Sequence, residues 1–588
     1  MARRGFAVLF TVLGFAVFIS IAGFVLLYLL FGREPTVSSN STLVLRVGGD
    51  LTEVAPNDVV SYVRGVKAPT VRSVVDNLRK AKVDARIRAV MLKPTGFQSP
   101  FWGKVQEIRD AVLEFKKSGK PVYGYLEYGG DREYYLATAA DKVFLMPSSP
   151  LDLTGIATYE LFLRGTLDKI GAFPDLHHVG QYKTAVNTFT EKGYTRAHKE
   201  MDESLTRDLY EQLVRGISDS RKKNEEEVRR LLDEGPFMPE DALHAGLIDD
   251  VAYEDQVEDK LRGGERTSRV DGDDYARVST TSIGLDRGPR IAVIHAAGAI
   301  AGGKSGFDPL NGAVAGSDTL IEYIRRARRD SLVRAIVLRI DSPGGSASAS
   351  DAIWRELMIT RQERADRPII ASMSDLAASG GYYIAMPAQV IVAQPSTLTG
   401  SIGIFGGKVV TGGVYEKIGA RIESTSIGKH AEINSPARPF NPDELRKLQE
   451  QLQSFYDQFV EKVADARHST PEKIDALAQG RVWTGRQAKQ NGLVDQLGGL
   501  DQAIAVAKQR AKIPADSGVE IVVYPPRKSF YEILTDEFSG SSESRMAAAW
   551  LGANLSGAEL QVLRTVRGPF GLFRRGEPLA LMPVSFLR

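Results

Sequence analysis

The chain has 588 residues, of which 43% are hydrophobic and 25% charged, a composition typical of folded proteins with several core-forming domains. Its 75 basic and 73 acidic residues leave a formal net charge of +2, so no overall positive field favours nucleic acid as a partner. The absence of cysteine excludes disulfides, thiolate metal sites and a cysteine nucleophile.

The first predicted element is a nearly continuous apolar run from Gly5 to Leu30. About 20 such residues cross the hydrocarbon core of a bilayer. Arg3 and Arg4 precede the run, so we expect this end to stay cytoplasmic and the rest to be exported, although Arg33 weakens the charge contrast. A cleaved signal peptide is the alternative, but its apolar core is usually about 7–15 residues long. We therefore predict a cytoplasmic stub and one retained transmembrane helix within residues 1–33.

A long internal repeat follows the anchor. Tyr134-Tyr135 recurs as Tyr382-Tyr383, and Lys169-Ile170-Gly171-Ala172 recurs as Lys417-Ile418-Gly419-Ala420, both at a separation of 248 residues. Two copies of one domain are therefore fused. We assign residues 34–262 to the first copy, 263–288 to a polar linker, 289–523 to the second copy and 524–588 to a C-terminal tail without a counterpart.

Within each copy, short apolar runs alternate with segments of helical composition. The predicted strands are 43–47, 89–92, 122–125, 335–338 and 369–372, and the predicted helices include 105–117, 205–222, 352–363 and 445–466. Continuous apolar runs of this length are typical of strands buried on both faces of a parallel sheet. The alternation predicts βαβ crossovers and an α/β fold in both copies.

The copies differ at two chemically useful positions. Ser379 of the second copy corresponds to Asp131 of the first, whereas Lys183 of the first copy corresponds to Ala431 of the second. A serine nucleophile needs a base, and none of the seven histidines lies beside a recognisable triad signature. A lysine can serve instead when burial lowers its pKa enough for the amine to lose its proton. Lys183 is therefore a candidate base for Ser379.

Glycine-containing segments surround the candidate serine. Asp341-Ser-Pro-Gly-Gly-Ser346 follows a predicted strand, so its backbone N–H groups could cradle an oxyanion or phosphate, or the segment could be a structural turn. Ala378-Ser-Gly-Gly381 allows close approach by a substrate, or equally a helix packed tightly on a sheet. Gly298 to Ser305 has the spacing of a phosphate loop, but the glycines and proline that follow argue against a helix there, so we expect no nucleotide site.

Taken together, four separated motifs resemble the signal peptide peptidase A (protease IV) family in its long, two-copy form. They are Gly180–Ala185, Asp341–Ser346, Ala377–Tyr383 and Pro395–Gly403, and the resemblance covers roughly Leu43 to Ile513. It implies a fold of the Clp-protease and crotonase type, and a bacterial serine protease anchored in the inner membrane with its catalytic domains on the periplasmic side. Asp341 departs from the pattern, where asparagine is expected more often.

The resemblance also implies roles for individual residues. Ser379 would be the nucleophile, Lys183 the general base, and Ser401 the residue that orients the lysine amine. For the oxyanion donors we expect the N–H of Gly380 and one N–H from the turn at Gly344 and Gly345. The family further implies a homotetramer, with released signal peptides and other apolar peptides as substrates. The sequence contains no metal-ligand cluster and no dinucleotide-binding glycine pattern, so we predict no cofactor or metal.

Two functions from other classes remain open. A crotonase-like acyl-CoA enzyme would use paired N–H donors on the same fold, with an acidic catalytic residue such as Asp131 in place of Lys183. If the protein were a non-catalytic membrane scaffold, the presence of Ser379, Lys183 and Ser401 together would be a coincidence. Loss of peptidase activity on replacing either Ser379 or Lys183 separates the protease from both alternatives.

Overall fold

The computed structural model describes residues 35–54, 70–264, 267–308, 312–526, 576–582 and 586–587, together with residues 14, 15, 18 and 23. The predicted anchor from Gly5 to Leu30 therefore lies almost entirely outside the described residues. Among the helices in the described part, none is both long and apolar enough to cross a bilayer. The transmembrane helix stays a prediction.

The first copy contains a six-stranded parallel sheet in the order β10-β1-β2-β3-β5-β9. These strands are β1 (Ser41–Gly49), β2 (Ile87–Phe97), β3 (Val122–Leu126), β5 (Lys142–Leu145), β9 (Asp250–Val251) and β10 (Ser268–Asp271). Helices α3 (Val71–Val83), α4 (Gly103–Lys116), α5 (Asp131–Ala137) and α8 (Arg196–Arg221) pack on one face, and α11 (Glu254–Arg262) packs on the other. Both faces are covered, which explains the continuous apolar runs of the central strands.

The second copy repeats this arrangement with an eight-stranded sheet whose main path is β21-β19-β17-β15-β11-β23. The strands are β11 (Arg290–Ala297), β15 (Val333–Ser342), β17 (Ile369–Ala378), β18 (Val390–Ala393), β19 (Leu398–Gly400), β21 (Val482–Thr484), β22 (Gln496–Leu497) and β23 (Glu520–Tyr524). Helices α13 (Ser317–Arg329), α14 (Ala347–Glu363) and α15 (Gly380–Ala385) pack on one face, and α20 (Leu500–Arg510) packs on the other. The predicted parallel strands and βαβ order are confirmed in both copies.

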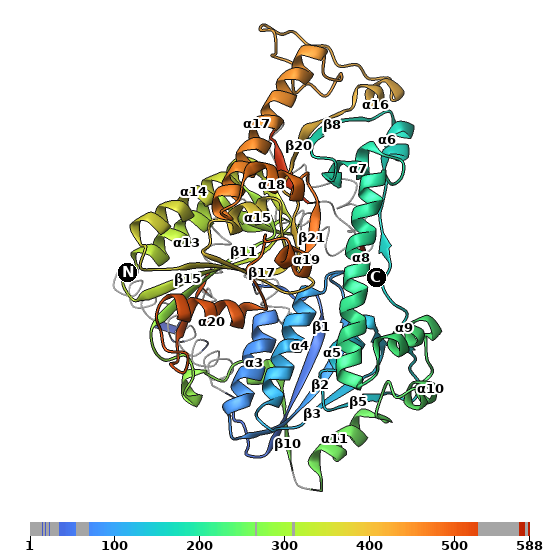
Figure 1. Cartoon of the computed structure of the whole chain (residues 1–588), viewed down its shortest axis with the longest axis vertical. Helices are drawn as coiled ribbons and strands as arrows, with labels where there is room; N and C mark the ends of the chain where they lie inside the picture. Colours follow the sequence, from blue (N-terminus) through green and yellow to red (C-terminus); the bar gives the residue numbers. More distant parts are fainter. Residues whose placement is uncertain are drawn as a thin grey trace, which may run out of the picture.

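A third sheet contains strands from both copies and from the C-terminal segment, in the order β13-β14-β12-β16-β24-β20-β8. Its members are β8 (Phe173–Val179), β12 (Ala299–Ala301), β13 (Gly306–Asp308), β14 (Gly312–Gly316), β16 (Gly344–Ser346), β20 (Ile404–Val410) and β24 (Leu579–Leu581). All seven residues of β8 pair antiparallel with β20. Figure 1 shows the result: α8 runs from the lower, first-copy sheet to α7 and β8, which lie beside the second copy. The segment that follows β8 therefore lies against the second copy, although it belongs to the first.

Shorter elements connect these layers. They are β4 (Gly129–Gly130), β6 (Leu151–Asp152), β7 (Thr158–Tyr159), β25 (Phe586–Leu587), α6 (Arg164–Ile170), η1 (Thr184–Val186), α7 (Asn187–Thr190), α9 (Glu225–Glu234), α10 (Pro239–His244), α12 (Gly272–Tyr275), η2 (Thr281–Ile283), α16 (Gly412–Lys417), α17 (Pro442–Ala466), α18 (Pro471–Leu477) and α19 (Gly485–Gln490). Local sequence explains the start of α17, where Asn441 and Glu444 form a capping box and Pro442 occupies the first turn.

Two segments are more ordered than their composition indicates. The stretch assigned to the linker contains β10 and α12, and its Tyr275 is fully buried, with its hydroxyl donating to Asp84. A few well-placed apolar residues suffice to fix an edge strand, and they are too sparse to give a periodic signal. The C-terminal tail supplies β24 to the third sheet. At Gly298 to Ser305, β12 is followed by a loop and β13, and the next helix begins only at Ser317, as the prediction against a phosphate loop requires.

Candidate active site

Lys183 of the first copy reaches Ser379 of the second. Its Nζ lies 2.7 Å from Ser379 Oγ, 3.0 Å from Ser401 Oγ and 2.9 Å from the Ser401 carbonyl oxygen. All three residues are fully buried, at 0% exposure. The structure therefore brings together the three side chains that sequence analysis selected, although 196 residues separate the lysine from the nearer serine.

The backbone around Lys183 is held by the second copy. Lys183 directly follows the turn after β8, and the N–H of Tyr182 donates to the Gln479 carbonyl at 2.7 Å. A Cβ atom on Gly480 would lie 2.5 Å from Lys183 Cα, so only glycine allows this approach. Sequence analysis missed Gly480, because the surrounding residues form no recognisable motif and its contact partner lies in the other copy.

Ser379 sits at a strained turn between β17 and α15. Its φ and ψ angles are 55° and −113°, and Ser401 also has a positive φ of 50°. Such conformations cost a non-glycine residue about 1–3 kcal/mol and persist only where the surroundings enforce them. Here the Ser379 N–H donates to the Gly400 carbonyl at 2.8 Å, and the Ser401 N–H donates to the Arg481 carbonyl at 2.7 Å. The strand-to-helix turn presents the Ser379 hydroxyl toward the lysine amine.

The electrostatic environment favours a neutral lysine. Burial holds the pKa of Lys183 well below its ordinary value, and no carboxylate among the described residues opposes this effect. An ammonium group that has lost its water without gaining a counter-ion is costly, so the amine releases its proton more readily. A neutral amine at hydrogen-bond distance from a hydroxyl can act as a general base toward it.

The predicted glycine turn lies against Ser379. A Cβ atom on Gly344 would lie 2.7 Å from the Gly380 nitrogen, and one on Gly380 would lie 3.1 Å from the Gly345 nitrogen. The Gly344 N–H donates to Ser342 Oγ at 3.2 Å, which directs it away from a ligand. Gly345 instead lies opposite Ala580 in the ladder with the C-terminal strand, so its N–H is open to a ligand only when that strand is displaced.

The C-terminal strand β24 occupies the edge of this turn. Gly345 pairs with Ala580 in antiparallel register, the Ala347 N–H donates to the Pro578 carbonyl at 3.2 Å, and the Met582 N–H donates to the Pro343 carbonyl at 2.8 Å. A Cβ atom on Gly344 would lie 2.0 Å from the Ala580 carbonyl oxygen, so this carbonyl and the Gly380 N–H border the same small space.

The side chains of β24 and of Met582, the residue that follows it, pack in two different apolar clusters. Leu579 and Leu581 pack in one cluster, and Met582 packs with Ala378, next to Ser379, in another. The first cluster is otherwise formed by Leu176, Val186, Phe189 and Phe405, which come from both copies. The chain thus places its own extended, apolar segment beside the serine, a feature that the sequence of the tail did not indicate.

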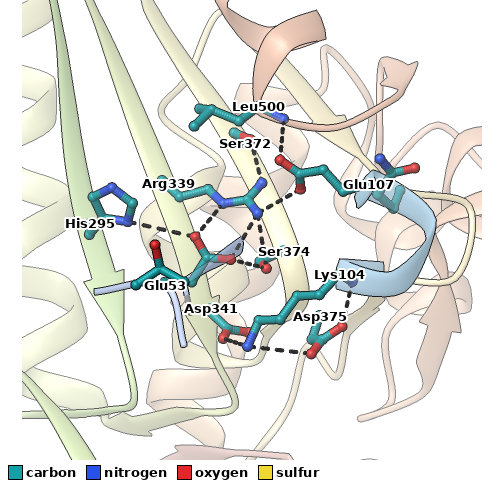
Figure 2. A network of polar contacts seen from close by, with 12 residues as sticks. Glu53, Lys104, Glu107, His295, Arg339, Asp341, Ser372, Ser374, Asp375 and Leu500 are labelled. Atoms are coloured by element: carbon teal, nitrogen blue, oxygen red, sulfur yellow. Dashed lines mark hydrogen bonds and ion pairs between the residues drawn. The ribbon is translucent and has the colours of Figure 1, made fainter. Parts of the chain in front are cut away.

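A buried ionic network joins the two copies behind the glycine turn (Figure 2). Arg339 of β15 donates to Glu53 at 2.8 and 2.9 Å and to Glu107 at 2.7 Å, both from the first copy. Arg339 is 1% exposed. Burial alone would lower its pKa, but the two carboxylates outweigh this and raise it above the ordinary value. The guanidinium therefore stays charged and ties the two sheets together.

The same network explains why an aspartate occupies position 341, where the family resemblance leads us to expect asparagine more often. Lys104 of the first copy lies 2.7 Å from Asp341 and 3.4 Å from Asp375, and Figure 2 shows its side chain extending to both carboxylates. Burial would lower the pKa of Lys104, but these carboxylates raise it. Asp341 also accepts from the Leu376 N–H at 3.2 Å, three residues before Ser379. The residue that opens the glycine turn is thus fixed by the other copy.

The other candidate residues lie elsewhere. Asp131 accepts from the backbone N–H groups of Thr154 and Gly155, and burial raises its pKa to about 6. His177 and His178 belong to β8 at the edge of the third sheet. Within the described part of the chain, one group has the donor spacing to hold a metal ion: Glu160, His198 and Asp202.

Comparison with known proteins decides the family. The sequence profile described as Peptidase family S49 matches residues 114–267 and again residues 361–514. The chain belongs to peptidase family S49. This S49 chain is a serine protease, and the double match confirms the tandem duplication read from the sequence. The family favours the protease over the acyl-CoA enzyme and the scaffold.

Three relatives of this S49 peptidase illustrate the match. "Serine protease SPPA, chloroplastic" of Arabidopsis thaliana is 39% identical over 78% of this chain and 68% of its own length. "Protease 4" of Salmonella typhi is 36% identical over 81% of this chain and 77% of its own. "Putative signal peptide peptidase SppA" of Enterococcus faecium is 31% identical over 40% of this chain and 64% of its own. The resemblance stated from the motifs is confirmed.

Proposed function

We propose that this protein is a membrane-anchored endopeptidase in which Ser379 is the nucleophile and Lys183 the general base. The observation that carries the proposal is the 2.7 Å distance between Lys183 Nζ and Ser379 Oγ, inside a fully buried site that lowers the lysine pKa. Ser401 orients the amine through its hydroxyl and its carbonyl. The two reacting groups come from different copies, so neither copy alone has a complete site.

The reaction follows from this geometry. The neutral Lys183 amine accepts the Ser379 proton while Oγ attacks the carbonyl carbon of the peptide bond. The resulting ammonium donates its proton to the leaving amine, and an acyl-enzyme remains on Ser379. Lys183 then takes a proton from a water molecule that attacks the ester, which releases the acid product and restores the serine.

The developing oxyanion requires preorganised donors. We assign them to the backbone N–H groups of Gly380 and Gly345, because Gly344 donates to Ser342 within its own turn, whereas Gly345 is released when a substrate replaces β24. Such donors stabilise the transition state without reorganisation, and loss of one typically costs about 100-fold to 1,000-fold in kcat.

The substrate is an extended, apolar peptide that binds as a strand against β16, in the place that β24 occupies. Support comes from the pairing of Ala580 with Gly345 and from the apolar pockets that hold Leu579 and Leu581. Main-chain pairing gives affinity for an extended segment, and alternate side-chain pockets give selectivity. Signal peptides released at the exported face of the membrane have this apolar character, and one relative carries that activity in its name.

The remaining parts of the proposal concern location and assembly. The apolar run from Gly5 to Leu30 would anchor the chain once in the bacterial inner membrane, with both copies on the periplasmic side. A homotetramer of such chains would enclose the active sites and restrict access to unfolded peptides.

The test is peptidase activity of the purified full-length chain in detergent, on a fluorogenic peptide with a signal-peptide-like apolar core. We expect Ser379→Ala and Lys183→Met each to abolish turnover. Matched controls are Ser396→Ala, another buried serine, and Lys80→Met, a buried lysine of the first copy that donates to backbone carbonyls. Both controls should retain most of the activity if they fold.

The outcomes separate the alternatives. Activity that survives Lys183→Met in a folded protein would remove the proposed base. Activity that survives Ser379→Ala would move the nucleophile elsewhere. Activity on apolar peptides no higher than on charged ones of the same length would contradict the substrate assignment while leaving the catalytic pair intact.

A further inference from the structure

Three possible metal ligands converge in the first copy, on the part that reaches toward the second. Glu160 directly follows β7, and His198 and Asp202 lie one turn apart near the start of α8. One nitrogen or oxygen atom from each of the three side chains lies within 4.8 Å of the other two. His198 is 1% exposed and Asp202 is 6% exposed, so this is a built interior site and not a surface group of acids.

Two of these atoms are buried without a hydrogen-bond partner. His198 Nε2 and Asp202 Oδ2 face each other at 3.6 Å, too far for a good hydrogen bond, and neither finds another partner among the described residues. A buried polar atom left without a partner costs about 1–3 kcal/mol, so each such atom requires an explanation, such as a bound ion. Their convergence on Glu160 points to a cation between them.

Within the described residues, the partners of the two helix ligands include no positively charged side chain: His198 has Asn187 and Asp202 beside it, and no lysine or arginine. An imidazole nitrogen and carboxylate oxygens are groups that bind divalent metal ions in proteins.

The imidazole ring is held in place by its neighbours. The rings of Phe162 and Tyr194 meet it edge-on, with centroid distances of 5.9 and 5.0 Å. Asn187 Nδ2 lies 3.5 Å from His198 Nδ1, on the side of the ring away from Asp202. Two ligands at positions i and i+4 of a helix project from one face, an arrangement that metal-binding helices use. Nε2 is thereby aimed at the carboxylates.

We propose that Glu160, His198 and Asp202 bind a divalent metal ion of the zinc class. An imidazole nitrogen with two carboxylate oxygens suits zinc better than Mg²⁺ or Ca²⁺, which prefer all-oxygen sites, and the absence of thiolates disfavours Cu(I). Bonds of about 2.0–2.2 Å in tetrahedral geometry place ligand atoms about 3.4 Å apart, so atoms at the 4.8 Å limit would have to close by about 1.4 Å, whereas His198 Nε2 and Asp202 Oδ2 are already 3.6 Å apart. The site is independent of the proposed peptidase mechanism.

The ion would join β7 to α8 in the part of the first copy that carries Lys183. Asn187, four residues after Lys183, contacts both His198 and the helix-capping Thr195. On the same helix, Met201 packs with Ala378, next to Ser379. The role of the metal is structural: it replaces missing hydrogen bonds where the two copies meet.

The test is zinc binding by the full-length chain in detergent after treatment with a chelator and its removal. We expect one Zn²⁺ per chain by elemental analysis, heat of binding in calorimetric titration with zinc chloride, and a higher unfolding temperature with zinc than without it. Asp202→Asn, which keeps the shape of the side chain, and His198→Gln should each weaken binding by about 100-fold or more, since even partners outside the ligand set cost 10-fold to 100-fold.

His177→Gln is the matched control, because His177 also lies beside an aspartate, Asp175 at 2.9 Å, but belongs to no such three-residue group among the residues that the structure describes. This variant should bind zinc like the native chain. The proposal is overturned if the native chain binds no zinc, if Asp202→Asn binds it with unchanged affinity, or if Mg²⁺ binds as tightly. The first and third measurements need no variant, so a variant that fails to fold leaves the test intact.

Discussion

Removal of the C-terminal strand should increase the affinity of the enzyme for peptides. The perturbation is a stop codon after residue 575, which deletes β24 together with Glu577, the partner of Ser346 and Ser348. If β24 occupies the groove that substrates use, it competes with them within the same molecule. While β24 is bound, only a fraction of the enzyme molecules have a free groove, and KM is raised in inverse proportion to that fraction. Deletion of β24 then lowers KM by the same factor.

The structure indicates how large this factor is. Leu579, Leu581 and Met582 are 3%, 5% and 3% exposed, and burial of three such side chains contributes about 4.5–9 kcal/mol. The hydrogen bonds of the segment add about 2–5 kcal/mol. Ordering the seven backbone residues 576–582 costs about 7–14 kcal/mol, so the two sides nearly cancel. Because β24 is paired in the structure, the occupied state is favoured; we take a preference of about 1.4 kcal/mol, which corresponds to a tenfold change in KM.

The assay is initial-rate peptidase kinetics on the fluorogenic apolar peptide, with circular dichroism to verify folding. We expect KM to fall by about tenfold while kcat changes little, because β24 contributes no group to the reacting pair. A stop after Met582 is the control, since it keeps β24 and removes only residues 583–588. An unchanged or higher KM in the folded truncated protein would refute the competition between β24 and substrate.

Three further predictions concern the residues around the site. Lys104→Met leaves the buried Asp375 and the half-buried Asp341 without their cation and should lower the free energy of unfolding by about 3–5 kcal/mol in urea titrations. Adding Asp341→Asn should recover part of this loss, and no recovery would argue against the pairing. Lys183→Met should be more stable than the native chain at pH 7, because the pKa of Lys183 is lowered by burial and the unfolded chain therefore holds a proton that the folded chain lacks. This advantage should shrink as the pH rises toward about 10.4, the ordinary lysine pKa, and a constant advantage in denaturant titrations across pH would contradict a neutral buried amine. Ser401→Ala should lower kcat by up to about 100-fold with little change in KM, because the amine loses one orienting contact; an unchanged kcat would show that the Ser401 carbonyl alone suffices.

The sequence predicted those features of the structure that depend on short local patterns or on the comparison of the two repeats. The apolar runs around Val90 and Val337 predicted buried parallel strands, because a strand covered on both faces must be apolar on both. The repeat predicted two similar domains, and the uneven retention of Ser379 and Lys183 singled out one serine and one lysine among many. Motifs at Gly380 and at the Gly344-Gly345 turn were recognisable because glycine is required where backbones approach closely.

Contacts between distant segments were not readable in this way. The pairing of Lys104 with Asp341, the approach of Gly480 to Lys183 and the placement of β24 at the glycine turn all join residues far apart in the chain. The convergence of Glu160 on His198 and Asp202 is of the same kind, although His198 and Asp202 have helical spacing. None of these residues belongs to a sequence pattern that names its partner.

The sequence by itself thus determined the central strands and helices of both copies, the duplication, and the choice of Ser379 and Lys183 as candidate reactive side chains, because these depend on local composition and on the comparison of one copy with the other. Tertiary structure alone decided that Lys183 and Ser379 meet, that the amine is stripped of water and counter-ions, and that the C-terminal strand lies beside them. The physical reason is that a lowered lysine pKa is a property of the surroundings and not of the residue. Those surroundings exist only after the two copies pack against each other.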